Sequence, residues 1–320
     1  MKIYYFLFIF FISCQYSSKT EKKNLLSQKL IAQEVEFNET FDILDMAIIN
    51  DYLIVMSYNS DTLIHIYSLP DMNLVSKMGL KGDSPSDMAF PLLFKGSENN
   101  AFIGGFNGGK DIKEYNITND HVSVINTFNI STLEPLNDAY IVNDSTLIYN
   151  SIFDLKLKKI NLKDHSVFDI CQFHQDDHQE SFFYSNKGKM GINKSSIVYA
   201  YFYKDQIDFM NLDGKLINRI IGKNVTPSIS MDKFDKNYIS YVNLYAGTKS
   251  FYLLHRGQTH ADYENNNSKD QLEVYDNKGE IIKKYTFEIP PIIFAVDEKR
   301  NVLYGYSGMY KDMLLVYKMD

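Results

Sequence analysis

Apolar and polar residues alternate in short runs along most of this chain, which is the pattern of half-buried β-strands. The clearest runs start about 45 to 55 residues apart. They are Tyr52–Tyr58, Ala101–Phe106, Thr146–Asn150, Ile197–Tyr203, Phe251–His255 and Val302–Tyr306. Turns rich in Asn, Asp, Gly and Lys separate the runs, and no sustained helical period appears. The pattern therefore predicts an all-β chain built from repeats.

Five of the six repeats also contain a clear, tight hairpin. The hairpins are Tyr67–Met78, Tyr115–Ile125, Ile160–Ile170, Asn211–Ile221 and Tyr275–Tyr285. The pairs Asp213-Gly214 and Lys278-Gly279 supply the residue types that adopt positive φ in such turns. Repeats of about 40 to 50 residues with four strands each are the signature of a β-propeller. We predict a six-bladed β-propeller with four-stranded antiparallel blades over residues 28–320.

The final repeat has only three predicted strands before Asp320. The segment Lys29–Phe37 is an orphan, because it has the pattern of a strand but no hairpin partner. We expect it to lie beside Met313–Lys318 as the missing outer strand. This pairing would close the ring and cover two strand edges that otherwise promote aggregation.

The first residues have the pattern of a targeting segment. Ile3–Ile12 is an apolar run of ten residues after Lys2, a typical length for the core of a signal peptide and about half of what a spanning helix needs. The run ends at Ser13-Cys14, which resembles the lipobox of bacterial lipoproteins, although Phe11 stands where the family usually has leucine. The resemblance implies that Cys14 is acylated and becomes the mature N-terminus. The alternative is an ordinary signal peptide that is cleaved nearby.

We accordingly predict a lipoprotein signal peptide over residues 1–13, followed by lipidated Cys14 and a flexible tether over residues 14–27. The stretch Gln15–Asn24 is too polar to bury apolar surface, which favours a tether. The expected location is the cell envelope, with the lipid anchor in the outer membrane and the protein facing the periplasm or the cell exterior.

Together, the lipobox, the short tether and the weak repeats resemble the six-bladed, TolB-like propeller lipoproteins of Bacteroidetes-type bacteria. Lys81–Phe90 looks like a link between blades in such proteins. The resemblance implies a fold and a location. It implies no chemistry, because no catalytic motif accompanies it.

Composition narrows the possible partners. Lys and Arg number 33 against 40 Asp and Glu, a net charge of −7, and no basic run occurs, so we expect no nucleic-acid partner. Two cysteines are too few for a disulfide scaffold or a four-cysteine zinc site. No cofactor motif is present, and we predict no cofactor.

A polar cluster between two predicted strands offers weak metal ligands. His174, Asp176 and His178 lie in the segment HQDDHQE and carry enough donor groups for a divalent ion. A solvated loop explains the same cluster more simply, so we predict no metal site there.

A second cluster follows the strand that ends at His255. Arg256 has the geometry to hold a carboxylate or phosphate, yet it can equally pair with a neighbouring Asp. The segment then runs through His260 in an unusually long loop. We expect Tyr203, His255, Arg256 and His260 to gather on the loop-rich face near the central channel, where they would suit an anionic or hydroxyl-rich ligand.

Three functions remain open on this basis. The favoured hypothesis is a non-catalytic binding or scaffold module for an envelope protein, peptide or glycan. The alternatives are a propeller lyase or hydrolase that uses His, Arg and Tyr residues of the funnel, and a structural subunit of an envelope complex without a small ligand.

Overall fold

The computed structural model describes most of the chain after its first residues. The described ranges are 18–37, 42–82, 84, 87–96, 101–106, 111–118, 121–129, 136–143, 145–151, 156–173, 182–224, 229–230, 232–265 and 269–320. The polar cluster with His174, Asp176 and His178, like Cys14, lies outside them. Within them, none of the helices is long and apolar enough to cross a membrane.

Antiparallel sheets make up nearly all of the described structure. The first sheet contains β4 (Ile43–Ile49), β5 (Tyr52–Ser57), β6 (Thr62–Ser68) and β7 (Asn73–Leu80). An eight-stranded sheet follows, with β8 (Met88–Gly96), β9 (Ala101–Phe106), β10 (Asp111–Thr118), β11 (His121–Asn129), β12 (Leu136–Asn143), β13 (Thr146–Ser151), β14 (Lys156–Asn161) and β15 (Val167–Gln172). Its two antiparallel halves are joined by a short parallel pairing of β8 with β12.

Three further sheets complete the described fold. One contains β16 (Gly188–Ile192), β17 (Ile197–Tyr201), β18 (Gln206–Met210) and β19 (Leu216–Ile221). The next contains β20 (Tyr238–Ala246), β21 (Ser250–Thr259), β22 (Gln271–Asp276) and β23 (Ile281–Phe287). The last contains β24 (Ile293–Asp297), β25 (Val302–Tyr306) and β26 (Met313–Lys318). The helices are short: α1 (Phe182–Asn186), the 3-10 helix η1 (Phe234–Lys236) and α2 (His260–Glu264).

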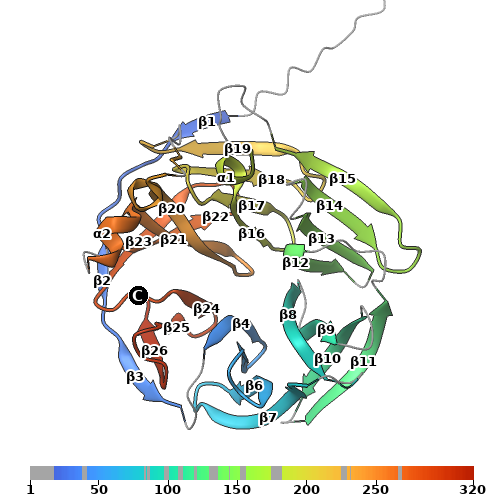
Figure 1. The fold of residues 1–320 in the computed structure, drawn as a ribbon. Coiled ribbons are helices and arrows are strands. Elements are labelled where there is room, and N and C mark those ends of the chain that lie inside the picture. The colour runs from blue at the N-terminus through green and yellow to red at the C-terminus, as the bar shows by residue number, and fades with distance from the viewer. Residues whose placement is uncertain are drawn as a thin grey trace, which may run out of the picture.

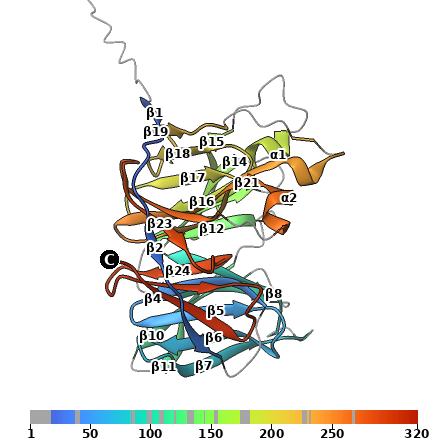
Figure 2. The same ribbon diagram turned by 90° about the vertical axis from the view of Figure 1, so that its left-hand side faces the viewer.

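The sheets stand around a common centre like the blades of a β-propeller (Figure 1). The strands β4, β8, β12, β16, β20 and β24 face the centre, and each sheet then continues outward. The helices α1 and α2 lie on the same side of the ring (Figure 2). We call that side the loop face.

The predicted strands and hairpins agree with this structure. β9 and β25 have the predicted bounds, and the other four predicted runs overlap β5, β13, β17 and β21. Gly214 and Gly279 adopt φ of 77° and 84° in their hairpins, as the turn chemistry predicts. The all-β class and its antiparallel sheets are therefore confirmed.

The N-terminal segment agrees with its prediction in part, because the expected pairing with Met313–Lys318 is present but two further strands precede it. Ser18–Glu21 (β1), expected within a flexible tether, pairs in parallel with β19. The segment expected as one closing strand is divided: Gln28–Leu30 (β2) pairs in parallel with β23, and Gln33–Glu36 (β3) pairs antiparallel with β26. We call residues 18–36 the N-terminal strap, which follows the outside of the ring in Figure 1. Backbone pairing holds β1 in place, which explains why the polar sequence around it gave no strand signal.

Candidate functional site

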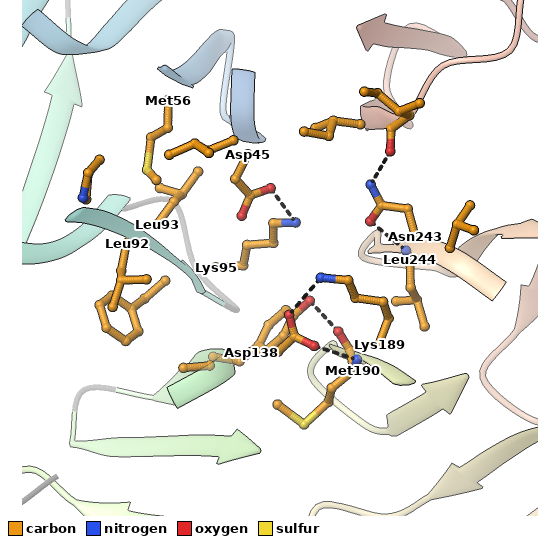
Figure 3. Close-up of a pocket in the computed structure, with 18 residues that line it drawn as sticks. Asp45, Met56, Leu92, Leu93, Lys95, Asp138, Lys189, Met190, Asn243 and Leu244 are labelled. Atoms are coloured by element: carbon orange, nitrogen blue, oxygen red, sulfur yellow. Dashed lines mark hydrogen bonds and ion pairs between the residues drawn. The ribbon is translucent and has the colours of Figure 1, made fainter. Parts of the chain in front are cut away.

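A cavity of about 420 Å³ lies at the centre of the ring (Figure 3). Its walls come from β4, β5, β8, β12, β16 and β20 and from the residues that lead into β24. Leu44, Asp138 and Lys189 lie near the beginnings of their inner strands. The connection from β21 to β22 carries α2 and reaches the same end of the ring, so this cavity belongs to the loop face.

Two ammonium–carboxylate pairs enter this central cavity. Lys95 Nζ lies 3.2 Å from Asp45 Oδ1, and Lys189 Nζ lies 3.6 Å from Asp138 Oδ1. Asp138 also accepts a hydrogen bond of 3.1 Å from the backbone N–H of Met190. Figure 3 shows the pairs projecting from different strands toward the open space. The cavity thus presents positively charged hydrogen-bond donors and negatively charged acceptors, and the charges of the two pairs cancel.

Neighbouring groups fix the protonation of this site. The negative charge of Asp138 raises the pKa of Lys189 despite the opposing effect of burial. Burial raises the pKa of Tyr140 well above its ordinary value, and its hydroxyl donates a hydrogen bond of 2.8 Å to the Met190 carbonyl. At neutral pH the site therefore holds a protonated lysine and a neutral tyrosine.

The remaining walls are mostly aliphatic. Leu44 and Leu92 are 47% and 41% exposed, so their side chains are available to a ligand. The aromatic lining residues Phe94 and Tyr140 are only 2% and 5% exposed. The cavity consequently offers aliphatic contact and few accessible ring faces.

A second cavity of about 260 Å³ lies toward the opposite face. It is lined by residues at the far ends of the inner strands, among them Ile49, Asn193 and Thr248. Lys95 lines both cavities, and its Nζ lies 5.5 Å from the centre of the Tyr245 ring. Lys95 therefore marks the boundary between them.

The charged residues of the central cavity were not among the predicted site residues. Asp45 and Lys95 each interrupt a short, largely apolar stretch, whereas Asp138 and Lys189 have polar or charged neighbours in the sequence. For Asp45 and Lys95, a single charge within the first strand of a repeat is a usable sequence signal, because that strand faces the propeller axis. The order of strands within each repeat was needed to recognise it.

Two of the predicted site residues lie in tightly packed surroundings. Tyr203 is 3% exposed and packs edge-on against Phe202 with ring centres 4.7 Å apart; burial raises its pKa to about 12. His255 Nε2 lies 3.6 Å from Asp205 Oδ1, and its ring centre is 5.0 Å from that of Tyr241. Both are therefore held by the protein's own side chains.

Arg256 and His260 also have partners within the chain. The Arg256 guanidinium donates two hydrogen bonds of 3.2 Å to Asp270, and its central carbon lies 3.5 Å from the centre of the Tyr263 ring. This is the pairing with a neighbouring Asp that the sequence left open. His260 begins α2, with Nδ1 3.3 Å from Glu264 Oε1.

The four predicted residues do not gather at the central cavity. None of Tyr203, His255, Arg256 and His260 is among the described residues that line it. Tyr203 lies in the turn after β17, His255 and Arg256 lie in β21, and His260 begins α2. Among the described residues, no group of three or more His, Cys, Asp or Glu side chains is arranged to hold a metal ion.

His255 belongs instead to a buried ionic cluster whose centre is Lys22 of the strap. Lys22 Nζ lies 3.1 Å from Asp205 Oδ1 and 2.9 Å from Glu273 Oε1, and it donates a hydrogen bond of 3.0 Å to the Tyr241 hydroxyl. The Glu273 side chain is fully buried. We call Lys22, Asp205, Glu273, Tyr241 and His255 the strap cluster.

Mutual attraction dominates the electrostatics of the strap cluster. Burial alone would lower the pKa of Lys22 and raise the pKa values of Asp205 and Glu273. The attraction between the opposite charges, with the contact from His255, outweighs burial, so the pKa of Lys22 is raised and those of both carboxyls are lowered. Lys22, Asp205 and Glu273 are therefore charged at neutral pH.

Comparison with solved structures supports the fold. The chain is similar to a member of the DUF4221 family from Bacteroides vulgatus, with 14% identity, a TM-score of 0.61, and coverage of 91% of this chain and 97% of that one. It is also similar to a putative exported protein from Bacteroides fragilis, with 9% identity, a TM-score of 0.57, and coverage of 94% and 98%. No protein-family profile and no curated protein sequence matches the chain. At these identities the likeness is one of fold alone.

Proposed function

We propose that this β-propeller is a non-catalytic binding module that takes an extended peptide segment in its central cavity on the loop face. The observation that carries the proposal is the pair of ammonium–carboxylate groups on aliphatic walls. An ammonium donates to peptide carbonyls and a carboxylate accepts from peptide N–H groups. Exposed leucines at the walls suit the apolar side chains that alternate along such a segment.

A peptide fits this lining better than a glycan does. Sugars are held largely by stacking on accessible aromatic faces. Phe94 and Tyr140, the aromatic residues of the lining, are both buried. The two ion pairs give the central cavity a balanced charge, which favours a ligand without large net charge. This replaces the expectation of an anionic ligand that was based on Arg256.

Binding is favoured over the alternative of a lyase or hydrolase. That alternative depended on His255 and Arg256 in the funnel, and the structure engages them with Asp205 and Asp270. Lys189 is held protonated by Asp138, so it is a poor general base. The remaining alternative, a structural subunit without a small ligand, does not account for a cavity that holds charged side chains.

We further infer that the sheets form a closed six-bladed ring of the TolB-like type. The eight-stranded sheet divides into two antiparallel halves at its parallel β8–β12 pairing, which supports six four-stranded units. The pairing of β3 with β26 brings a segment from near the start of the chain to its last strand and supports closure.

The location is part of the proposal. We propose that Cys14 carries the lipid anchor and places the propeller in the cell envelope, at the outer membrane, on the strength of the lipobox resemblance. Metabolic labelling with an alkyne fatty acid should tag the wild type and not Cys14→Ser. Equal labelling of both proteins would contradict the assignment.

Methionine NMR tests the binding proposal directly, because Met56 and Met190 line the central cavity. In protein carrying ¹³C-methyl methionine, the capped peptide acetyl-Leu-Ser-Leu-amide should shift these two signals, whereas maltotriose should not. The double variant Lys189→Gln/Asp138→Asn should weaken the peptide by about tenfold, since charge-assisted hydrogen bonds are lost. The exposed control Lys215→Gln, in the β18–β19 hairpin, should leave binding unchanged. Shifts caused by maltotriose and not by the peptide would overturn the proposal.

A further inference from the structure

A cavity of about 530 Å³ lies away from the centre of the ring, between the sheet of β20–β23 and the sheet of β24–β26. Its walls come from α2, from the link between β23 and β24, and from the turn between β25 and β26. All three belong to the end of the ring that carries α2, so the cavity opens on the loop face. We call it the rim pocket. None of the predicted site residues lines it.

The rim pocket is negatively charged. Glu264, Asp270 and Glu288 line it, and no lysine, arginine or histidine does so among the described residues. The neighbouring cations offset only part of this charge. Arg256 neutralises Asp270, whereas Lys29 approaches Glu288 only to 4.0 Å, and both side chains of that pair are about half exposed. His260 Nδ1 lies 3.3 Å from Glu264, whose side chain remains 66% exposed.

Aromatic and apolar side chains complete the walls of the rim pocket. Tyr263, Phe287 and Tyr310 line it together with Met309, which is 78% exposed. One cation of the protein itself already contacts an aromatic ring and a carboxylate of this pocket. At this wall the guanidinium of Arg256 lies against the Tyr263 ring at 3.5 Å while Asp270 accepts its hydrogen bonds.

We propose that the rim pocket binds an organic cation, namely the guanidinium or ammonium group of a basic side chain. Carboxylates supply charge and hydrogen-bond acceptors, and ring faces attract a cation that has lost part of its water shell. The internal arrangement of Arg256, Tyr263 and Asp270 is the template for this recognition. A planar guanidinium suits it better than a compact ammonium does.

The rim pocket does not depend on the peptide proposal, although Ile292 lines both cavities. Met309 reports on the rim pocket, whereas Met56 and Met190 report on the central cavity. One spectrum therefore separates the two sites. The Met309→Leu variant assigns the rim signal by its disappearance.

The test uses acetyl-arginine-methylamide and its neutral isostere acetyl-citrulline-methylamide as probes of ¹³C-methyl-methionine protein. The arginine probe should shift the Met309 signal in a saturable way, and the citrulline probe should bind at least about fivefold more weakly. Glu288→Gln and Glu264→Gln should each weaken the arginine probe by about twofold to fivefold, as expected for half-exposed charge pairs. Added salt should weaken it further.

Two variants of Tyr310 test whether its aromatic ring contributes to binding of the arginine probe. Tyr310→Phe keeps the ring and should bind like the wild type, whereas Tyr310→Leu should bind several-fold more weakly. Asp213→Asn, an exposed acid in the β18–β19 hairpin, is the charge control and should change nothing. Melting temperatures identify any variant that fails to fold, in which case the glutamate variants decide.

Three results would overturn the proposal. They are equal binding of the arginine and citrulline probes, an arginine probe that shifts Met56 and Met190 but not Met309, and an effect of Asp213→Asn as large as that of Glu288→Gln.

Discussion

The two halves of the ring differ in what covers their outer strands. In the half formed by β16 to β26, the strap pairs with β19, β23 and β26. In the half formed by β4 to β15, no described strand pairs with the outer edges of β7, β11 and β15. Each of these open strands exposes two large apolar side chains; they are Leu74, Leu80, Val124, Ile125, Val167 and Phe168. Among the covered strands, β19 and β23 expose one each.

The covered half also contains the strap cluster, which ties the strap to the interior by charge. Lys22 reaches Asp205 just before β18 and Glu273 on β22, so one side chain joins two sheets. Removing one member of a buried ion pair leaves an uncompensated charge, which is far more costly than the loss of an exposed pair. The stability of this half therefore depends on a segment remote in sequence.

Removal of the strap should have the largest effect. A chain that begins at residue 38 loses three strand pairings, the buried side chain of Leu30 and the Lys22 charge together. We expect its melting temperature to fall by about 10–20 °C, or cooperative unfolding to disappear. A chain that begins at Ser18 keeps the strap and should melt like the longer protein. Equal melting of both truncations would show that the strap contributes nothing to the covered half.

Single substitution of Lys22 should have the next largest effect. Lys22→Met leaves buried Glu273 and Asp205 without their main counter-ion, and we expect a loss of about 3 kcal/mol in the free energy of unfolding. Lys284, 3.8 Å from Glu273, keeps the loss near the lower end of the usual range. The next residue provides the control, because Lys23 pairs with Glu280 at 2.6 Å with both side chains more than half exposed. Urea unfolding of Lys23→Met should differ from the wild type by less than about 1 kcal/mol.

A compensating substitution tests whether charge or packing causes that loss. Adding Glu273→Gln to Lys22→Met removes the buried uncompensated charge, so the double variant should recover part of the stability. If Glu273→Gln lowers the free energy of unfolding of Lys22→Met as much as it lowers that of the wild type, the effect of Lys22 arises from packing.

The pH dependence of stability should follow the strap cluster. The pKa values of Asp205 and Glu273 are lowered from 3.8 and 4.5, so their contribution is fully present above those values and is lost as pH falls through the folded-state pKa values. In Lys22→Met that stabilising attraction is missing. The difference in unfolding free energy between wild type and Lys22→Met should thus be largest near pH 7 and shrink below about pH 4. A difference that is constant from pH 7 to pH 3 would contradict the electrostatic account.

The same contrast shows what the sequence could predict. Hairpins such as Asn211–Ile221 and strands such as Val302–Tyr306 were found because periodicity and turn residues are local signals. Ser18–Glu21 was missed because an edge strand held by backbone pairing needs no apolar pattern. Lys22 could not be assigned from its neighbours, since its partners lie 183 residues away at Asp205 and further still at Glu273.

The candidate site was missed for a related reason. His255 and Arg256 attracted attention by their chemistry, yet His255 lies beside Asp205, which is distant in sequence, and Arg256 is engaged by the nearby Asp270. Asp45 and Lys95 looked like ordinary surface charges in the sequence. They face the axis because their strands are the innermost of their sheets, a property of topology that composition does not carry.

Amide exchange should reveal the smallest difference between the halves. About half of the amides in an outer strand point away from the sheet, and in an open strand they meet only water. In β19 the outward groups have β1 as a partner, with Asn218 to Ile221 in register with Ser18 to Glu21. We expect the outward amides of β19 to exchange at least about tenfold more slowly than those of β15 in native-state exchange measured by NMR. Lys22→Met, which loosens the strap without removing it, should bring the β19 rates toward those of β15 and leave β15 unchanged. Equal exchange of the two strands in the wild type would mean that β1 does not protect the edge that it covers.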